Sequence, residues 1–170
     1  CLPTPYDSKI KQYNKTSIIE VCSELKLHNY NGLVVIKSTV EPETTEYLVE
    51  KTGLKIVHNP EFLTAKTAYE DFKSQEHIVL GYPKNLDKEV LNILIKFYSN
   101  YYPMANFSIL TSTESELMKL GVNTFYAVKI QYFNELYLLS EKLGISYENV
   151  KDTMLKNNWI NPMHTKVPGT

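Results

Sequence analysis

Residues 32–40, which read GLVVIKSTV, decide the fold of this 170-residue chain. After Gly32 comes an unbroken run of aliphatic side chains, Leu33 to Ile36, which is typical of a short parallel strand buried on both faces. A polar triplet, Lys37 to Thr39, follows where that strand would end. Because ligands bind at the carboxyl edge of such sheets, this one segment predicts a fold class and the position of a site.

Helical and strand patterns alternate on both sides of this segment up to residue 111. They predict helices over 15–28, from Glu41 to about Gly53, around 66–72 and over 87–98, with Pro42 near the first turn of the second helix. Short apolar runs predict further strands at 55–57, 77–81 and 107–110. This β-α-β order predicts an α/β fold with a parallel sheet over residues 1–111.

A long helix is predicted to start at residue 112. Residues 111–114, Thr-Ser-Thr-Glu, offer N-cap hydroxyls followed by an acid, and a helical apolar stripe then continues without proline to Gly144. The stripe consists of Leu117, Leu120, Phe125, Val128, Tyr132, Leu136, Leu139 and Leu143. About 30 residues of helix are roughly 45 Å long, which favours a spine between domains or across a dimer. A shorter helix, from Ser146 to about Asn157, completes an all-α segment over 112–170.

Composition argues against several classes of protein. A formal net charge of −1 argues against a nucleic-acid binder, and no apolar run approaches the ~18 residues that a membrane-spanning helix needs. Two cysteines and four histidines, none at metal-ligand spacing, predict no metal site and favour a reducing, cytoplasmic setting. All 18 basic residues are lysine, so any anion must be held by ammonium groups, hydroxyls or backbone N–H groups, not by a guanidinium fork.

Three polar clusters are candidates for chemistry. Residues 3–5, Pro-Thr-Pro, follow an expected strand stub, residues 37–40 place two hydroxyls after a strand, and residues 59–62 place a carboxylate after the next strand. Composition alone favours a turn at each place, whereas a shared position at one sheet edge favours a site. On the long helix, Lys119 and Asn123 lie four residues apart and share a face, although a lysine beside an apolar stripe is more often a surface residue.

The clusters occur together in an order that resembles the UDP-glucose/GDP-mannose dehydrogenase family. The matching stretches are Leu2-Pro3-Thr4-Pro5, Val35-Ile36-Lys37-Ser38-Thr39-Val40, Asn59-Pro60-Glu61-Phe62-Leu63 with Ala68, Asp71 and Phe72, Ile78-Val79-Leu80-Gly81, Glu116-Leu117-x-Lys119-Leu120-x-x-Asn123, and Phe133-Asn134-Glu135-Leu136. Each stretch is weak alone, and the ordered set is specific. The resemblance implies the later half of a Rossmann-type NAD-binding domain at 1–111 and a helical central domain, which forms a homodimer through the long helix, at 112–170.

The resemblance also implies an activity. It is the oxidation of the primary alcohol of a nucleotide sugar, UDP-glucose first, to a carboxylate by two NAD-dependent hydride transfers through a cysteine thioester. GDP-mannose and UDP-N-acetyl-mannosamine are alternative substrates within the family. A non-catalytic dimerisation module is the alternative from another class of protein.

Cofactor residues are implied at two strand ends. Pro3 and Thr4 are expected to lie against the NAD dinucleotide. Ser38 and Thr39 are also expected to contact NAD, and Thr39 to help order a water. These roles follow from the resemblance, residue by residue.

Catalytic and substrate residues are implied in the same way. Glu61 is expected to act as general base in thioester hydrolysis, and Thr39 to assist it. Lys119 is expected to stabilise the developing alkoxide or to serve as base, and Asn123 to hold the same oxygen or a water. The residues expected to contact the sugar nucleotide are Glu61, Phe62, Leu63, Thr64, Lys119 and Asn123.

The chain departs from the family pattern in three places. Many members have a second glutamate four residues after the Glu61 position, where this chain has Ala65. The Gly-x-Gly-x-x-Gly turn is expected upstream and the catalytic cysteine loop downstream, and neither Cys1 nor Cys22 matches that nucleophile. The chain is therefore expected to be an internal fragment that is inactive alone, because covalent catalysis requires its nucleophile.

Overall fold

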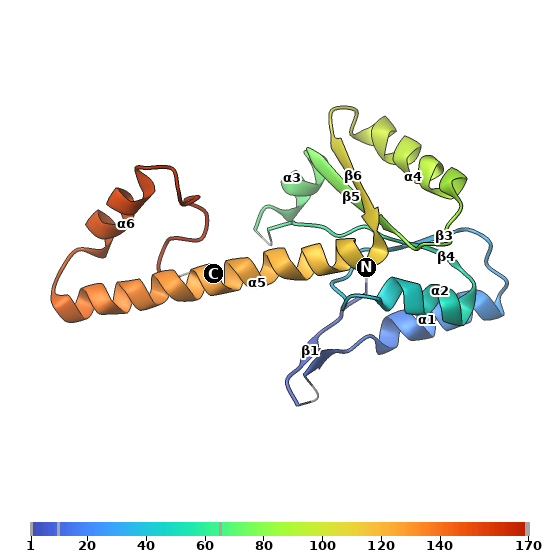
Figure 1. Cartoon of the computed structure of the whole chain (residues 1–170), viewed down its shortest axis with the longest axis horizontal. Coiled ribbons are helices and arrows are strands. Elements are labelled where there is room, and N and C mark those ends of the chain that lie inside the picture. Colours follow the sequence, from blue (N-terminus) through green and yellow to red (C-terminus); the bar gives the residue numbers. More distant parts are fainter. Residues whose placement is uncertain (1, 10, 65, 169–170) are drawn as a thin grey trace. The chain divides into compact units, whose positions relative to one another are not determined.

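The computed structural model describes residues 2–9, 11–64 and 66–168, which divide into two units, 1–120 and 121–170. The first unit holds a four-stranded sheet, in the order β3-β4-β5-β6, with helices packed against it (Figure 1). The strands are β3 (Leu33–Ile36), β4 (Lys55–His58), β5 (His77–Tyr82) and β6 (Asn106–Thr111). The predicted α/β fold is confirmed.

The helices lie close to the predicted positions. They are α1 (Thr16–Leu27), α2 (Thr44–Thr52), α3 (Ala68–Lys73), α4 (Lys88–Tyr101), α5 (Ser112–Leu143) and α6 (Tyr147–Leu155). Helix α2 ends at Gly53, whose φ of 72° is left-handed and suits glycine. Helix α5 begins as predicted, because the Glu114 carboxylate accepts hydrogen bonds from the backbone N–H and the hydroxyl of Thr111, at 2.8 and 2.7 Å.

Two hydrophobic cores pack against opposite faces of the sheet. Successive side chains of a strand point to opposite faces, and in β4 Ile56 joins one core while Val57 joins the other. The first core also contains Ile18, Cys22, Ile36 and Leu48, from α1, β3 and α2. The second also contains Ile78, Leu80, Leu91 and Leu94, from β5 and α4. The layers leave the strand ends free to carry polar groups.

Strand direction differs from the prediction at one junction. The pairs β3–β4 and β5–β6 are parallel, as predicted, but β4 and β5 meet in the antiparallel sense through a single pair, His58 opposite Gly81. The sheet is therefore mixed. Apolar runs predict which segments are strands, but they carry no information about the direction in which two strands meet.

Two local expectations were wrong. Leu2 is not in a strand, so among the described residues no strand stub precedes Pro3; instead a short antiparallel hairpin, β1 (Tyr6–Asp7) with β2 (Gln12–Tyr13), follows. Helix α2 begins only at Thr44, and Pro42 lies ahead of it, because Glu43 takes a left-handed conformation with φ of 74° that interrupts the helix.

The second unit contains the rest of α5, helix α6 and the segment that follows. Phe133 and Tyr147 are buried, and the Tyr147 hydroxyl donates to the Thr165 carbonyl oxygen at 2.5 Å. Six of the eight residues of the predicted apolar stripe, namely Leu117, Phe125, Val128, Tyr132, Leu139 and Leu143, are exposed in the single chain. Among the described residues, no helix is both long enough and apolar enough to cross a membrane.

Candidate active site

A cavity of about 280 Å³ opens at the ends of strands β3 and β4 in the first unit. Its lining consists of Leu2, Pro3, Thr4, Lys37, Ser38, Thr39, Glu61, Leu63 and Lys119. These residues come from three separate stretches of chain and from helix α5. The polar groups that the sequence places after two strands therefore do gather at one edge of the sheet.

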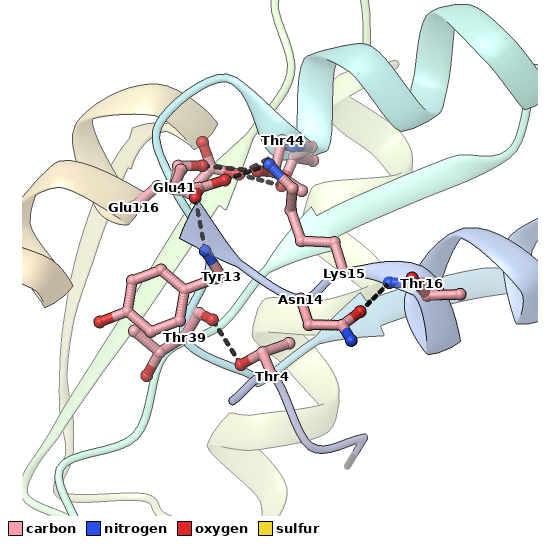
Figure 2. A network of polar contacts seen from close by, with 10 residues as sticks. Thr4, Tyr13, Asn14, Lys15, Thr16, Thr39, Glu41, Thr44 and Glu116 are labelled. Carbon is pink, nitrogen blue, oxygen red and sulfur yellow. Dashed lines mark hydrogen bonds and ion pairs between the residues drawn. The ribbon is translucent and has the colours of Figure 1, made fainter. Parts of the chain in front are cut away.

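One wall of the cavity is held together by hydroxyl groups. The Thr4 hydroxyl donates to the Thr39 carbonyl oxygen at 2.6 Å (Figure 2). The Ser38 hydroxyl donates to the Leu2 carbonyl oxygen at 2.5 Å. Among the described residues, the Thr39 hydroxyl makes no hydrogen bond of this kind to a backbone carbonyl oxygen. This wall could cradle a dinucleotide, because Thr4 and Ser38 shape it while the hydroxyl of Thr39 stays available to a ligand.

Glu41 fixes this wall to the neighbouring hairpin. Its carboxylate accepts the backbone N–H of Tyr13 at 2.8 Å and also pairs with the Lys15 ammonium (Figure 2). Burial raises the pKa of Glu41, but the bonds from Lys15 and Tyr13 outweigh it, so the net pKa is lowered. Glu41 thus stays ionised and ties the hairpin to the segment that carries Thr39.

Glu61 and Lys119 form the opposite wall. The Lys119 ammonium donates to the backbone carbonyl oxygen of Glu61 and lies 4.4 Å from the centre of the Phe62 ring. Lys119 is only 9% exposed, and burial lowers its pKa, an effect that Glu61 opposes and Lys37 reinforces. A partly desolvated ammonium beside a carboxylate can stabilise an oxyanion next to a general base.

The first turns of α5 are anchored on both sides, and this anchoring positions Lys119. On one side Ser115 packs against Gly81 of β5, where an added Cβ would lie 2.4 Å from the Ser115 Cβ. On the other side the buried Glu116 carboxylate accepts from the Thr45 N–H and hydroxyl, at 2.8 and 2.6 Å, at the start of α2. The helix can approach β5 this closely only because residue 81 is glycine.

His58 is a buried titratable group behind the cavity. Its Nδ1 lies 2.8 Å from the Ser115 hydroxyl, and its Nε2 has no hydrogen-bond partner of normal geometry. The pKa of His58 is lowered to about 4, mainly by burial and further by the positive charges of Lys119 and Lys37. Hydrogen bonding to the Ser38 backbone partly opposes this shift. His58 is therefore neutral at physiological pH and adds no charge to the cavity.

The structure brings most of the expected site residues together. Pro3, Thr4, Ser38, Thr39, Glu61, Leu63 and Lys119 line the cavity, and Phe62 lies against Lys119. Thr64 does not line it, and its backbone N–H donates to Asp71 instead, at 2.9 Å. Asn123 belongs to the second unit, four residues further along α5, and Ala65 lies outside the described residues. The roles of all these residues stay predictions.

Lys37 lines the cavity although the sequence assigned it no role. Its ammonium donates to the Asn59 side-chain oxygen at 3.0 Å and lies 3.9 Å from Glu61 Oε2. The signal for it was present, because a charged residue directly follows a buried strand at the functional sheet edge.

Two family models match the chain. Residues 1–101 match the NAD binding domain of the UDP-glucose/GDP-mannose dehydrogenase family, and residues 113–169 match the central domain of the same family. A curated UDP-glucose 6-dehydrogenase from Rickettsia bellii is 36% identical over 140 residues, which cover 78% of this chain and 32% of that protein. The chain spans about a third of the length of the curated relatives it matches.

Solved structures match over nearly the whole chain. A UDP-glucose dehydrogenase from Pyrobaculum islandicum is 29% identical, with a TM-score of 0.83 over 95% of this chain and 39% of the other. A GDP-mannose dehydrogenase from Pseudomonas aeruginosa, at 23% identity, has a TM-score of 0.78 over 98% of this chain and 41% of the other. The second likeness concerns the fold alone.

Proposed function

The chain belongs to the UDP-glucose/GDP-mannose dehydrogenase family, as its motifs predict, and we propose that it supplies the water-handling part of an NAD-dependent enzyme that oxidises UDP-glucose to UDP-glucuronate. The observation that carries this proposal is the cavity in which Thr39, Glu61 and Lys119 converge. In the complete reaction one alcohol, one water and two NAD give one carboxylate, two NADH and three protons. Pro3, Thr4, Ser38 and Thr39 would hold NAD, which would supply the hydride acceptor for each oxidation.

The residues of this chain have distinct tasks in that reaction. Glu61 takes the proton of a water as the water attacks a thioester carbonyl carbon, a task that contributes about 10²- to 10⁴-fold in rate. Lys119 holds the oxygen that becomes negative, and loss of such a donor costs about 10²- to 10³-fold. The Thr39 hydroxyl orients the water. Asn123 holds the same oxygen or water as Lys119.

We also propose the division of labour along the chain. Residues 1–111 are the later part of the NAD-binding domain, and residues 112–170 are part of the central domain. The 170 residues alone carry no cysteine that matches the family nucleophile and are expected to be inactive with UDP-glucose and NAD.

NADH formation by the full-length gene product tests the activity. UDP-glucose, GDP-mannose and UDP-N-acetyl-mannosamine are compared as substrates, and the proposal expects the highest kcat/KM with UDP-glucose. Lys119→Met should lower kcat about 10²-fold or more, while Lys96→Met, which changes an exposed lysine of α4, should leave it unchanged. A higher kcat/KM with another nucleotide sugar would overturn the proposed substrate assignment. No NADH formation with any of the three would overturn the proposed dehydrogenase activity.

Dimerisation through α5 is a second proposal, and the exposed apolar stripe favours it. Phe125, Val128 and Tyr132 of the stripe line a groove of about 340 Å³ in the second unit together with Trp159. A non-catalytic dimerisation module would use the same surface. Sedimentation velocity of the wild type and of Tyr132→Lys is the test: a dimer that the substitution dissociates supports the interface, and a wild-type monomer excludes it.

A further inference from the structure

Lys37 stands directly beside the group proposed as the base. Its side chain is 19% exposed, and its ammonium lies 3.9 Å from Glu61 Oε2. Two of its contacts are directed the other way, to the Asn59 side-chain oxygen at 3.0 Å and to the Asn59 backbone oxygen at 3.4 Å. An ammonium has three donors, so one remains for the side of Glu61.

Asn59, which supports this lysine, is itself held in place by hydrogen bonds. It is 2% exposed; its side-chain N–H donates to the Val79 carbonyl oxygen at 2.8 Å, and its backbone N–H donates to the Ile36 carbonyl oxygen at 2.8 Å. Its side-chain oxygen accepts from Lys37 and also from the Tyr98 hydroxyl at 2.5 Å. The position of the Lys37 ammonium is therefore fixed by groups from β3, β5 and α4.

The charged and titratable groups around Lys37 define its electrostatic partner. Glu61 is the carboxylate that faces it, Lys119 of α5 is a like charge, and His58 at the end of β4 is neutral above about pH 4. Burial lowers the pKa of Lys37, and Glu61 opposes that shift. Glu61 thus has one lysine at its backbone oxygen and another at its carboxylate.

We propose that Lys37 is a positioning residue for Glu61: held by Asn59 and Tyr98, its ammonium keeps the Glu61 carboxylate turned to the cavity, where it meets the attacking water. This inference rests on the proposed role of Glu61 as a base. A purely structural Lys37 would affect stability alone. A positioning Lys37 affects the rate of the step that uses Glu61 and has no effect once Glu61 is gone.

A double-mutant cycle in the full-length enzyme measures this dependence. Lys37→Met should lower kcat about 10- to 100-fold with KM for the nucleotide sugar unchanged, because a displaced base loses its near-attack geometry. The same substitution in a Glu61→Gln background should cause no further loss, since the two residues act as one unit. Lys151→Met, which removes a buried lysine paired with Glu148 in the second unit, is the matched control and should leave kcat unchanged.

Two further measurements keep the proposal testable. If Lys37→Met does not fold, Tyr98→Phe takes its place, because it removes only the hydroxyl that donates to Asn59. Tyr98→Phe should also lower kcat, by a smaller factor than Lys37→Met. In the 170-residue chain, ¹³C NMR of the lysine Cε groups should show that Glu61→Gln moves the titration of Lys37 to lower pH, because the attraction that raises its pKa is lost. Glu148→Gln should not move it.

The outcomes separate the two proposals. The positioning role is overturned if Glu61→Gln leaves the Lys37 titration unchanged. It is also overturned if Lys37→Met lowers kcat by the same factor in the wild type and in the Glu61→Gln background. Absence of dehydrogenase activity overturns the proposed function, and the Lys37 titration then still decides whether the pair exists.

Discussion

Gly81→Ala should displace the start of α5 and with it Lys119. The new Cβ would lie 2.4 Å from the Ser115 Cβ, 2.9 Å from the Ser115 Oγ and 3.1 Å from the Ser112 Cα. Carbon atoms in contact are separated by about 3.5–4.0 Å, so α5 and β5 must move apart by roughly 1 Å or more. Overpacking of this kind costs about 1–3 kcal/mol in the free energy of unfolding.

The Lys119 side chain reports this displacement. Its ammonium lies 4.4 Å from the centre of the Phe62 ring, so ring currents should shift its ε-methylene proton resonances upfield. In Gly81→Ala that shift should decrease, and urea unfolding should show the loss of stability. In the full-length enzyme a displacement of about 1 Å at Lys119 should cost on the order of 10²-fold in kcat.

Two comparisons isolate the cause. Gly53→Ala introduces a side chain at a φ of 72° with nothing within 4 Å, so it should cost about 1–2 kcal/mol by backbone strain and leave the Lys119 resonances unchanged. Ser115→Gly removes both Ser115 atoms that the new Cβ meets and should restore part of the Lys119 shift in the Gly81→Ala background. Unchanged Lys119 resonances in Gly81→Ala, or no restoration by Ser115→Gly, would refute the packing argument.

Two buried groups should give the unfolding free energy opposite pH dependences. His58 is protonated near pH 6.5 in the unfolded chain and only near pH 4 in the folded chain. The free energy of unfolding should therefore fall by up to about 3 kcal/mol as the pH drops through this window. In urea titrations, His58→Gln should remove that dependence. Burial raises the pKa of Glu116 above 4.5, so its charge opposes folding at higher pH. Relative to wild type, Glu116→Gln should therefore gain stability as the pH rises above 4.5, and a constant difference would contradict this.

The layout of the first unit could be predicted because burial leaves a direct trace in the sequence. The run Leu33 to Ile36 has both faces in apolar cores, and Ile56 and Val57 face opposite cores, so these strands had to be apolar throughout. The start of α5 was predictable for a similar local reason, since Thr111 and Glu114 meet within one turn. Such features depend on neighbours in sequence.

Features that depend on distant partners, and strands too short to show a periodic pattern, could not be predicted. The antiparallel contact of β4 with β5 rests on the single pair His58 and Gly81, and the hairpin β1–β2 has two residues a strand, too few for a periodic pattern. The support of Lys37 by Asn59 joins residues 22 positions apart, and that of Asn59 by Tyr98 joins residues 39 apart. The residue types at these positions do not indicate which distant residue each one contacts.

The absence of arginine explains why these supports matter. A guanidinium orients itself by its planar fork, whereas an ammonium is a point charge on a flexible stem whose direction must come from its surroundings. Both lysines of the cavity have such surroundings: Asn59 for Lys37, and the Glu61 carbonyl oxygen with the Phe62 ring for Lys119. In a chain whose 18 basic residues are all lysine, the precision of the site therefore resides in the residues that hold its lysines. Tyr98, which reaches Lys37 only through Asn59, then belongs to the site through that support.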